Sequence, residues 1–261
     1  MAVDVFENIV SKKQQQILLD YFNKKDDLID SRPDVFSKSP KWNVTKDWPQ
    51  ETLKKILDAV FDVKYQPENV FFYSSKASFR LHVDSGEGNQ NILHKNTIIP
   101  LYIDGPSTTI IFKNKWRGGH VRFGIKQISP FNYDIPNKQG KMVKIEDIRK
   151  LKDISHLDIT QKELDDLILL RSGKKDIHKP DERVTDYSLI EGYNADLKFD
   201  PQIHEQYCNH IPIENLHGLT IDSIIEWKLG DIITFDRQHL HCAGSGHNKK
   251  MMVSVFTNVG D

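Results

Sequence analysis

Hydrophobic side chains near the N-terminus recur with the period of an α-helix. Ser11 and Gln14 have the spacing of a capping box, and apolar residues follow at positions 17, 18, 21 and 22. Asp47 and Gln50 form a second such box, after which apolar residues recur at i, i+3, i+4, i+7 and i+8. We therefore expect residues 1–68 to form helices whose apolar faces pack against the rest of the chain.

From residue 69 onward the hydrophobic period changes to two. The segments NVFFYSS, SFRLHVD, NTIIPLYID and STTIIFKN are short and rich in β-branched and aromatic residues, and turn-forming stretches separate them. Strand patterns return near the C-terminus in GDIITFDRQHLHCAG and KKMMVSVFTNV. We expect residues 69–116 and 216–258 to form one β-rich core.

Residues 117–200 interrupt this pattern of strands. They contain Lys- and Asp-rich loops and one capped helix, which begins with Thr160 and Glu163 and ends near Gly173. We interpret the segment as an insertion within a single domain that spans residues 1–261. Long segments between core strands commonly form a lid or a substrate wall, but a surface elaboration without such a role is an equal alternative.

Composition narrows the classes of partner. The chain has 36 basic and 37 acidic residues, so no strong net charge attracts nucleic acid or anionic lipid. No run approaches the roughly 18 apolar residues that a membrane span needs. The two cysteines, Cys208 and Cys242, lack a CxxC spacing, which argues against a disulfide framework. We expect a cytoplasmic protein with neither a membrane nor a nucleic acid as its partner.

The segment RLHVDSGEG carries the first candidate for chemistry. In an extended strand, His82 and Asp84 project from one face while Leu81 and Val83 project from the other. With a second histidine from elsewhere, such a pair forms the two-histidine, one-carboxylate triad of non-haem Fe(II) sites. A His-x-Asp pair alone is weak evidence, since most such pairs are structural or lie at the surface.

The C-terminal segment supplies the missing groups. His239 and His241 lie at the end of a predicted strand, and Lys250 opens the next strand. A lysine that points inward from an apolar strand is costly to bury unless it meets an anion, and a dicarboxylic cosubstrate would be one. The alternative is that Lys250 begins an edge strand with its ammonium group in solvent.

Together these positions resemble the Fe(II)- and 2-oxoglutarate-dependent oxygenase superfamily, most closely its prolyl 4-hydroxylase-like and phytanoyl-CoA hydroxylase-like branches. The residues that carry the resemblance are His82, Asp84, His241 and Lys250. The resemblance implies a mainly β fold with flanking helices, built on a double-stranded β-helix (a jelly roll, cupin-like). It also implies Fe(II), 2-oxoglutarate and O₂, with ascorbate as a reductant.

The same resemblance assigns roles to individual side chains. His82, Asp84 and His241 would bind the metal, and Lys250 would bind the distal carboxylate of 2-oxoglutarate. Hydroxyl groups on neighbouring strands would assist Lys250, and the candidates are Ser254, Tyr102 and Tyr73.

Two further choices concern His241 and Arg80. We prefer His241 to His239 as the distal ligand because Lys250 follows it by nine positions. The small residues in CAGSG also allow the backbone to pass close to a metal. Arg80 shares a strand face with His82 and would contact the substrate or pair with a nearby carboxylate.

The expected reaction is hydroxylation of an unactivated C–H bond in a small molecule or an amino-acid residue, with release of succinate and CO₂. One alternative is a cupin-like hydrolase or isomerase that uses the same three ligands for another metal. A second alternative is a non-catalytic β-sandwich binding module with incidental histidines. Formation of succinate separates the oxygenase from both alternatives.

Overall fold

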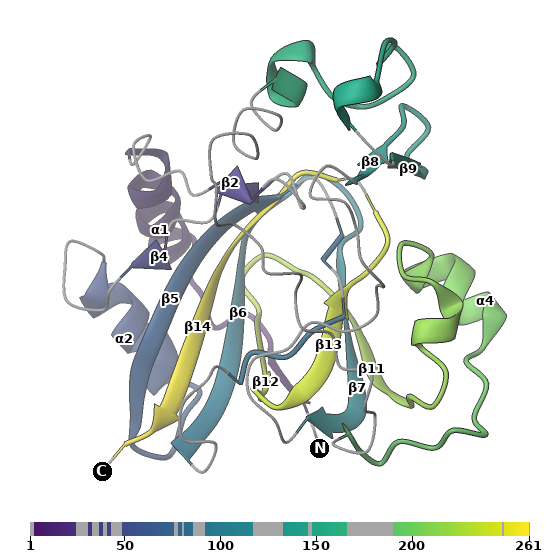
Figure 1. Cartoon of the computed structure of the whole chain (residues 1–261). Coiled ribbons are helices and arrows are strands. Elements are labelled where there is room, and N and C mark those ends of the chain that lie inside the picture. The colour runs from purple at the N-terminus through teal and green to yellow at the C-terminus, as the bar shows by residue number, and fades with distance from the viewer. Residues whose placement is uncertain are drawn as a thin grey trace, which may run out of the picture.

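The computed structural model describes residues 3–24, 31–32, 37–38, 41–42, 49–75, 78–79, 81–85, 92–116, 133–145, 148–165, 190–246 and 248–260. Two antiparallel β-sheets face each other, and α1 and α2 lie on the outer side of the larger sheet (Figure 1). Apart from the two-residue strand at Ile190–Glu191, the strands of both sheets come from either side of residues 117–200 in the sequence. The chain thus has the mainly β architecture with flanking helices that its hydrophobic pattern predicts.

The larger sheet is built around two long strands, β6 and β14. Its order is β1 (Val3–Phe6), β12 (Ile232–Asp236), β6 (Leu93–Ile103), β14 (Lys250–Val259), β5 (Tyr65–Ser75), β3 (Ser37–Lys38) and β2 (Ser31–Arg32). The short strand β4 (Lys41–Trp42) also pairs with β5. Because β14 lies between β5 and β6, side chains near its start lie at the centre of the sheet.

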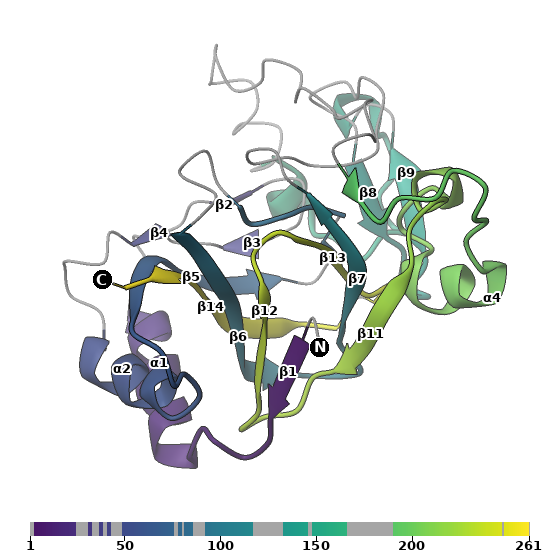
Figure 2. The same ribbon diagram turned by 90° about the horizontal axis from the view of Figure 1, so that it is seen from below.

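The smaller sheet is centred on β7 (Thr108–Trp116). Strand β11 (Ile221–Glu226) and the short β10 (Ile190–Glu191) pair with β7, as does β13 (His239–Ala243). The extended segment 81–85 runs beside β13, since His82 and His241 form a β-bridge. Figure 2 shows β7 and β11 across from the larger sheet, whose outer side carries α1 and α2.

This connectivity is a double-stranded β-helix. The chain passes from β5 in the larger sheet to segment 81–85 in the smaller, returns to β6, and crosses again to β7. After residues 117–200, β11 lies in the smaller sheet, β12 in the larger, β13 in the smaller and β14 in the larger. The jelly-roll fold predicted from the sequence is therefore confirmed.

Helices α1 (Lys12–Lys24) and α2 (Gln50–Asp58) bury their apolar faces on the larger sheet, where Leu18, Leu53 and Ile56 are almost inaccessible to solvent. The Ser11–Gln14 capping box is present, because the Ser11 amide and hydroxyl both donate to Gln14 Oε1. The capping box predicted from Asp47 and Gln50 does not mark the start of α2. Pro49 is the N-cap without a side-chain cap, and residue 47 lies outside the described residues.

The first residues correct one expectation. They were predicted to be helical, yet Val3–Phe6 forms the edge strand β1, with Val3 opposite Phe235 of β12. The segment VDVF alternates apolar and polar residues, and its pairing partner lies more than 200 positions away in the sequence. Among the described residues, no helix is long and apolar enough to cross a membrane.

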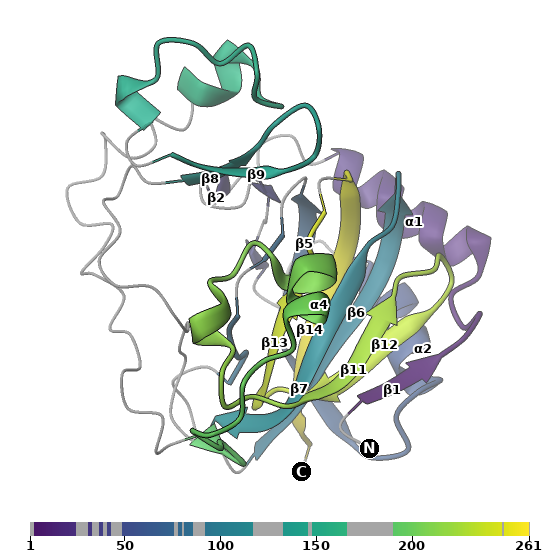
Figure 3. The same ribbon diagram turned by 90° about the vertical axis from the view of Figure 1, so that its right-hand side faces the viewer.

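The segment 117–200 contributes a small unit with its own core. A hairpin of β8 (Tyr133–Pro136) and β9 (Met142–Ile145) stands apart from the two sheets in Figure 3. Its buried side chains include Ile135, Ile148 and Leu157. The Thr160–Glu163 capping box is present at a helix that begins at residue 161, and the predicted end near residue 173 lies outside the described residues.

Residues 190–219 instead pack against the outer face of the smaller sheet. The short helix α4 (Pro201–Ile203), the π-helical turn His204–Cys208 and the 3-10 turn Ile213–Asn215 surround a core that includes Phe199, Cys208 and Leu216. Leu81 and Val83 of the extended segment belong to this core. The apolar side of segment 81–85 is therefore fixed, and His82 and Asp84 face the space between the sheets.

Candidate metal centre

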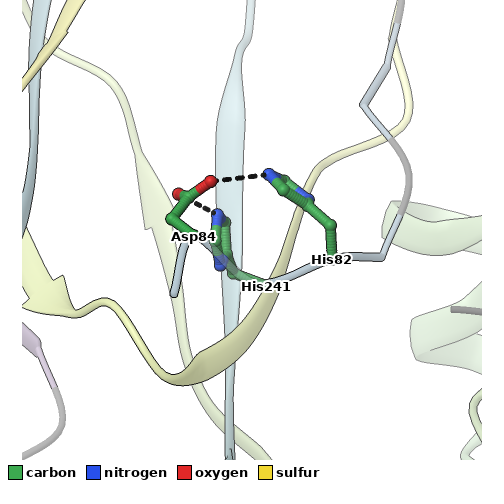
Figure 4. A group of neighbouring side chains, drawn as sticks. All are labelled: His82, Asp84 and His241. Carbon is green, nitrogen blue, oxygen red and sulfur yellow. Dashed lines mark ion pairs between the residues drawn. The ribbon is translucent and has the colours of Figure 1, made fainter. Parts of the chain in front are cut away.

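Side chains from two neighbouring segments converge between the sheets. His82 and Asp84 come from the extended segment 81–85 and His241 from β13, and each offers a ligand atom within 4.8 Å of the others. Figure 4 shows the carboxylate of Asp84 facing both imidazole rings. Its oxygens lie 3.1 Å from Nε2 of His241 and 3.7 Å from Nε2 of His82. Two imidazoles and one carboxylate thus converge as the sequence predicts.

Backbone pairing sets this arrangement. The amide of His82 donates to the carbonyl of His241, and the amide of His241 donates to the carbonyl of His82, each at 3.0 Å. Residues paired directly in this way project from the same face of a sheet, so the two rings lie side by side with centroids 4.1 Å apart. Leu81 and Val83 point to the opposite, apolar face and are almost fully buried.

The hydrogen bond of His241 defines which ring nitrogen can bind a metal. Its Nδ1 lies 3.0 Å from the carbonyl oxygen of His239. A carbonyl can only accept a hydrogen bond, so Nδ1 donates to it, and Nε2, which faces Asp84, is the ring nitrogen placed to bind a metal. Metal-binding histidines are commonly oriented in this way.

Asp84 is held in its ionised form. Its side chain is about nine-tenths buried, and burial alone would raise its pKa. The positive charges that His241, His82 and Arg237 can carry outweigh this effect and keep the pKa of Asp84 well below its usual range. A buried carboxylate beside two imidazoles matches the donor set of a two-histidine, one-carboxylate Fe(II) site.

Arg237 forms hydrogen bonds to both the backbone of Asp84 and the end of β14. It is 1% exposed, and its Nε donates to the carbonyl of Asp84 at 2.9 Å. The amide of Asp84 donates back to the carbonyl of Arg237. The guanidinium group also contacts the side chains of Asn258 and Glu68. Arg237 is not among the site residues predicted from the sequence, because nothing in the FDRQHLHC segment shows which backbone it contacts.

A second buried contact acts on the carboxylate itself. Asn96 of β6 donates from Nδ2 to Oδ2 of Asp84 at 2.6 Å. Ser254 of β14 in turn donates its hydroxyl hydrogen to Oδ1 of Asn96 at 2.9 Å. Ser254 therefore faces the site as its strand position predicts, but its hydroxyl hydrogen is directed to Asn96. Its role as a 2-oxoglutarate contact stays a prediction.

Lys250 shares a cavity with the three ligands. This cavity is also lined by Tyr73, Trp227, Thr109 and Ser254. Lys250 is 7% exposed, its Nζ lies 5.3 Å from the centroid of the Trp227 ring, and burial lowers its pKa to about 8. Among the described residues, no carboxylate forms an ion pair with it. The cavity thus holds a buried cation that lacks a carboxylate partner in the described part of the chain.

Trp227 and Thr109 are cavity residues that the sequence analysis did not identify. The indole Nε1 donates to Thr109 Oγ1 at 2.8 Å, which fixes the ring beneath the ammonium group of Lys250. Neither residue belongs to a recognisable motif, because strands β7 and β11 of the smaller sheet bring them together only in the folded chain.

Tyr102 is not brought to this cavity, whereas Tyr73 is. Tyr102 is 41% exposed, and its ring centroid lies 5.7 Å from Nζ of Lys249. The cause is a β-bulge: Met252 pairs with Pro100 and Met251 pairs with Tyr102, so one residue of β6 is skipped. The bulge moves Tyr102 to the face opposite the cavity.

The remaining candidates are also placed. The ring of His239 is used elsewhere, since its Nδ1 lies 2.7 Å from the carbonyl oxygen of Phe112 and its Nε2 lies 3.7 Å from Asp236. Its backbone carbonyl, rather than its side chain, supports His241. Arg80 lies outside the described residues, and its role stays a prediction.

A scan against models of protein families found no match, and neither did a search of curated proteins. Solved structures do match. EctD from S. alaskensis with 2-oxoglutarate and 5-hydroxyectoine is 10% identical, with a TM-score of 0.46, and the match covers 99% of this chain and 72% of that one.

Two further structures match over nearly the whole chain. The viral collagen prolyl hydroxylase from Paramecium Bursaria Chlorella virus-1, in its 2OG complex, is 10% identical with a TM-score of 0.41, over 100% and 97% of the two chains. The non-heme alpha ketoglutarate dependent carbocyclase SnoK from nogalamycin biosynthesis is 8% identical with a TM-score of 0.45, over 98% and 79%.

Proposed function

We propose that the protein is an Fe(II)- and 2-oxoglutarate-dependent dioxygenase that hydroxylates an unactivated C–H bond. In the overall reaction, substrate R–H, 2-oxoglutarate and O₂ give R–OH, succinate and CO₂. The donor set of His82, Asp84 and His241 supports this, because two imidazoles and one carboxylate would hold Fe(II) and leave it accessible to 2-oxoglutarate and O₂.

The observation that carries the proposal is the buried ammonium group of Lys250 in the same cavity as the three ligands. Burial of a charged group without an opposite charge costs on the order of 2 kcal/mol or more. A dicarboxylate that binds the metal through one end and Lys250 through the other would use both features at once.

Other cavity side chains fit the same cosubstrate. Thr109 Oγ1 accepts the indole N–H of Trp227, so its own hydroxyl hydrogen is available to a carboxylate near Lys250. The face of the Trp227 ring favours the charged form of Lys250. Tyr73 lines the same cavity and supplies a second hydroxyl group.

The chain would position the reactants and exclude water, while a bound metal, with 2-oxoglutarate and O₂, would supply the oxidising chemistry. His82, Asp84 and His241 would hold the metal, and Lys250 would orient the cosubstrate. Phe79 packs on the ring of His82 with centroids 4.4 Å apart, which shields that ligand from solvent. The substrate is a small molecule or an amino-acid residue that enters the open side of this cavity.

The proposal is tested by release of CO₂ from 2-oxoglutarate labelled at the carboxyl group next to the keto carbon, measured together with O₂ uptake. The protein is supplied with Fe(II), and a metabolite library is screened for compounds that raise turnover. We expect Fe(II)-dependent CO₂ release that His82→Ala abolishes. Stoichiometric metal binding without CO₂ release would favour a metal-dependent hydrolase or isomerase, and absence of metal binding would favour a binding module.

A further inference from the structure

Two aromatic rings line the cavity beside the metal ligands. Phe79 packs on the ring of His82, with centroids 4.4 Å apart. Phe256 pairs with Asn96 across β14 and β6, and Asn96 is the residue that donates to Asp84. Both phenylalanines line the cavity, and both are only half-buried. A molecule that approaches the metal can therefore contact either ring.

The ring of Phe256 lies on the side of the metal centre away from Lys250. Alternation along β14 directs Lys250, Ser254 and Phe256 to one face, and all three line the cavity. Ser254 is level with the ligands, because its hydroxyl reaches Asp84 through Asn96. Lys250 lies four residues before Ser254, and Phe256 lies two residues after it. A cosubstrate that extends from the metal to Lys250 therefore leaves the Phe256 side to the substrate.

The backbone of Phe79 is held by two donors. Its carbonyl oxygen accepts from the amide of Ala243 at 3.1 Å and lies 3.3 Å from Nε2 of His210. A carbonyl only accepts hydrogen bonds, so Nε2 of His210 donates to it. Nδ1 of His210 lies 3.1 Å from the hydroxyl oxygen of Ser245, so both ring nitrogens are engaged. Residues 190–219, which pack on the smaller sheet, thus help to fix the position of Phe79.

Phe256 packs on two buried side chains. Its ring centroid lies 5.0 Å from that of Phe71 and 5.1 Å from the guanidinium carbon of Arg237. Arg237 is 1% exposed, pairs with Glu68 and does not line the cavity. The cavity is therefore in contact with the ring of Phe256 and not with the charge of Arg237.

The polar groups of the cavity gather toward Lys250. Ser75 pairs with Lys250, and Tyr73 pairs with Met252, across β5 and β14. Apart from the three ligands and Lys250, the described residues that line the cavity carry no charged side chain. Around Phe79 and Phe256, binding free energy must therefore come mainly from burial of apolar surface.

We propose that the C–H bond oxidised by this protein belongs to an apolar ring or branched alkyl group of the substrate, held against Phe79 and Phe256. The inference rests on the proposed function, because it names the class of substrate for that site. A charged or polyhydroxylated group would lose its hydration beside these rings without gaining polar partners among the described residues. An apolar group has no such cost and gains contact with both rings.

The test measures binding of three probes that share a six-carbon ring, which are cyclohexanol, myo-inositol and cyclohexanecarboxylate. Affinities come from NMR titrations of the metal-free full chain, so neither a metal nor turnover is required. The carboxylate is compared with cyclohexanol in Lys250→Met, so that binding at Lys250 cannot imitate an anion site for the substrate.

Four variants show where cyclohexanol binds. Phe79→Asn and Phe256→Asn replace a ring with a polar side chain, whereas Phe79→Leu keeps an apolar one. Tyr102→Asn is the matched control, because Tyr102 is a half-exposed aromatic residue on the face of β6 opposite the cavity.

We expect cyclohexanol to bind about tenfold or more tightly than either other probe. Each phenylalanine-to-asparagine variant should weaken its binding by about fivefold or more, while Phe79→Leu and Tyr102→Asn stay within about twofold of the wild type. If the asparagine variants do not fold, the ranking of the three probes decides.

Three results would overturn the inference. They are no detectable binding of cyclohexanol, equal or tighter binding of inositol or the carboxylate, and folded asparagine variants at Phe79 and Phe256 that behave like Tyr102→Asn. Failure of the wild type to release CO₂ from 2-oxoglutarate would instead refute the proposed function. The apolar site would then still stand, because its measurement involves no cosubstrate.

Discussion

The ammonium group of Lys250 lies 5.3 Å from the centroid of the Trp227 ring, inside the cavity that contains His82, Asp84 and His241. The ring face attracts the positive charge but does not neutralise it. A cation and a triad of metal ligands thus share one enclosure between the two sheets. A molecule that bridges them must carry a negative charge at one end and metal-binding groups at the other.

Lys250→Met should stabilise the fold and weaken the binding of 2-oxoglutarate. Removing a buried charge that lacks a carboxylate partner is expected to raise the free energy of unfolding by about 1 kcal/mol. The same change should weaken binding of 2-oxoglutarate by roughly 30-fold or more, because it removes the partner of a buried carboxylate. Chemical denaturation and equilibrium binding measure the two effects.

The neighbouring lysine provides the control for this variant. Lys249 is exposed and contacts the ring of Tyr102 on the other face of the sheet. Lys249→Met should leave both stability and 2-oxoglutarate affinity close to the wild-type values. Equal cosubstrate affinity in Lys250→Met and Lys249→Met would exclude Lys250 as the carboxylate contact.

The pKa of Lys250, about 8, predicts how binding of 2-oxoglutarate depends on pH. The dissociation constant should be constant below pH 8 and rise by up to about tenfold per pH unit above it, because the neutral amine no longer attracts the carboxylate. Lys250→Arg should remove this dependence, since a guanidinium group stays charged throughout. A wild-type profile that stays flat from pH 7 to 9.5 is the contrary outcome.

As the pH rises from 8 to 10.5, the contribution of Lys250 should increase the free energy of unfolding, whereas the affinity for 2-oxoglutarate should fall. Burial lowers the pKa of Lys250 in the folded chain from about 10.5 to about 8, so between these values the unfolded chain binds more protons. The contribution of Lys250 to the free energy of unfolding is therefore unfavourable below pH 8 and diminishes as the pH rises toward 10.5. Denaturation of the wild type and Lys250→Met at pH 7 and pH 10 should show their difference shrinking.

Arg237→Met should weaken the metal centre without touching a metal ligand. It removes the buried guanidinium group that donates to the carbonyl of Asp84 and pairs with the half-exposed Glu68, so we expect a loss of about 3 kcal/mol in stability. Metal affinity should fall by about tenfold because the Asp84 backbone is no longer held. Glu68→Gln removes only the charge of the half-exposed partner and should cost much less on both measures. Similar effects of the two variants would show that the ion pair, not the backbone contact, is what matters.

His239 and His241 should behave differently although they are two positions apart. The His241 side chain faces Asp84, so His241→Ala should abolish metal binding. The His239 ring contacts the carbonyl of Phe112, and His239→Ala should cost about 1–3 kcal/mol of stability while metal affinity stays within a few-fold. Metal titration of the folded variants checks this. Loss of metal binding in His239→Ala alone would reverse the assignment.

The local pattern was enough to predict the arrangement around His82 and Asp84. Alternation places Leu81 and Val83 in the apolar core and the two ligands on the opposite face, as the structure has them. The spacing to Lys250 identified His241 as the partner. These inferences depend on strand periodicity and short sequence distances, which the sequence displays directly.

What the sequence did not predict depends on contacts between distant segments. Arg237 and Trp227 act on the site through contacts between segments that lie far apart in the chain. Asn96 is near Asp84 in the sequence, but it contacts Asp84 only because β6 of the larger sheet faces segment 81–85 in the folded chain. All three residue types are common at other positions. Tyr102 was expected to face the cavity, but a single bulge in β6 reverses its face. Alternation predicts a face only as long as no residue is skipped.

The most direct test of the account is an anaerobic titration of the Fe(II)-loaded protein with 2-oxoglutarate, followed by visible absorption. Chelation of Fe(II) by the keto acid produces a visible charge-transfer band. We expect this band to saturate at one 2-oxoglutarate per chain in the wild type, to require a much higher concentration in Lys250→Met, and to be absent in His241→Ala. A wild-type protein that binds Fe(II) yet develops no such band at any 2-oxoglutarate concentration would contradict the central claim.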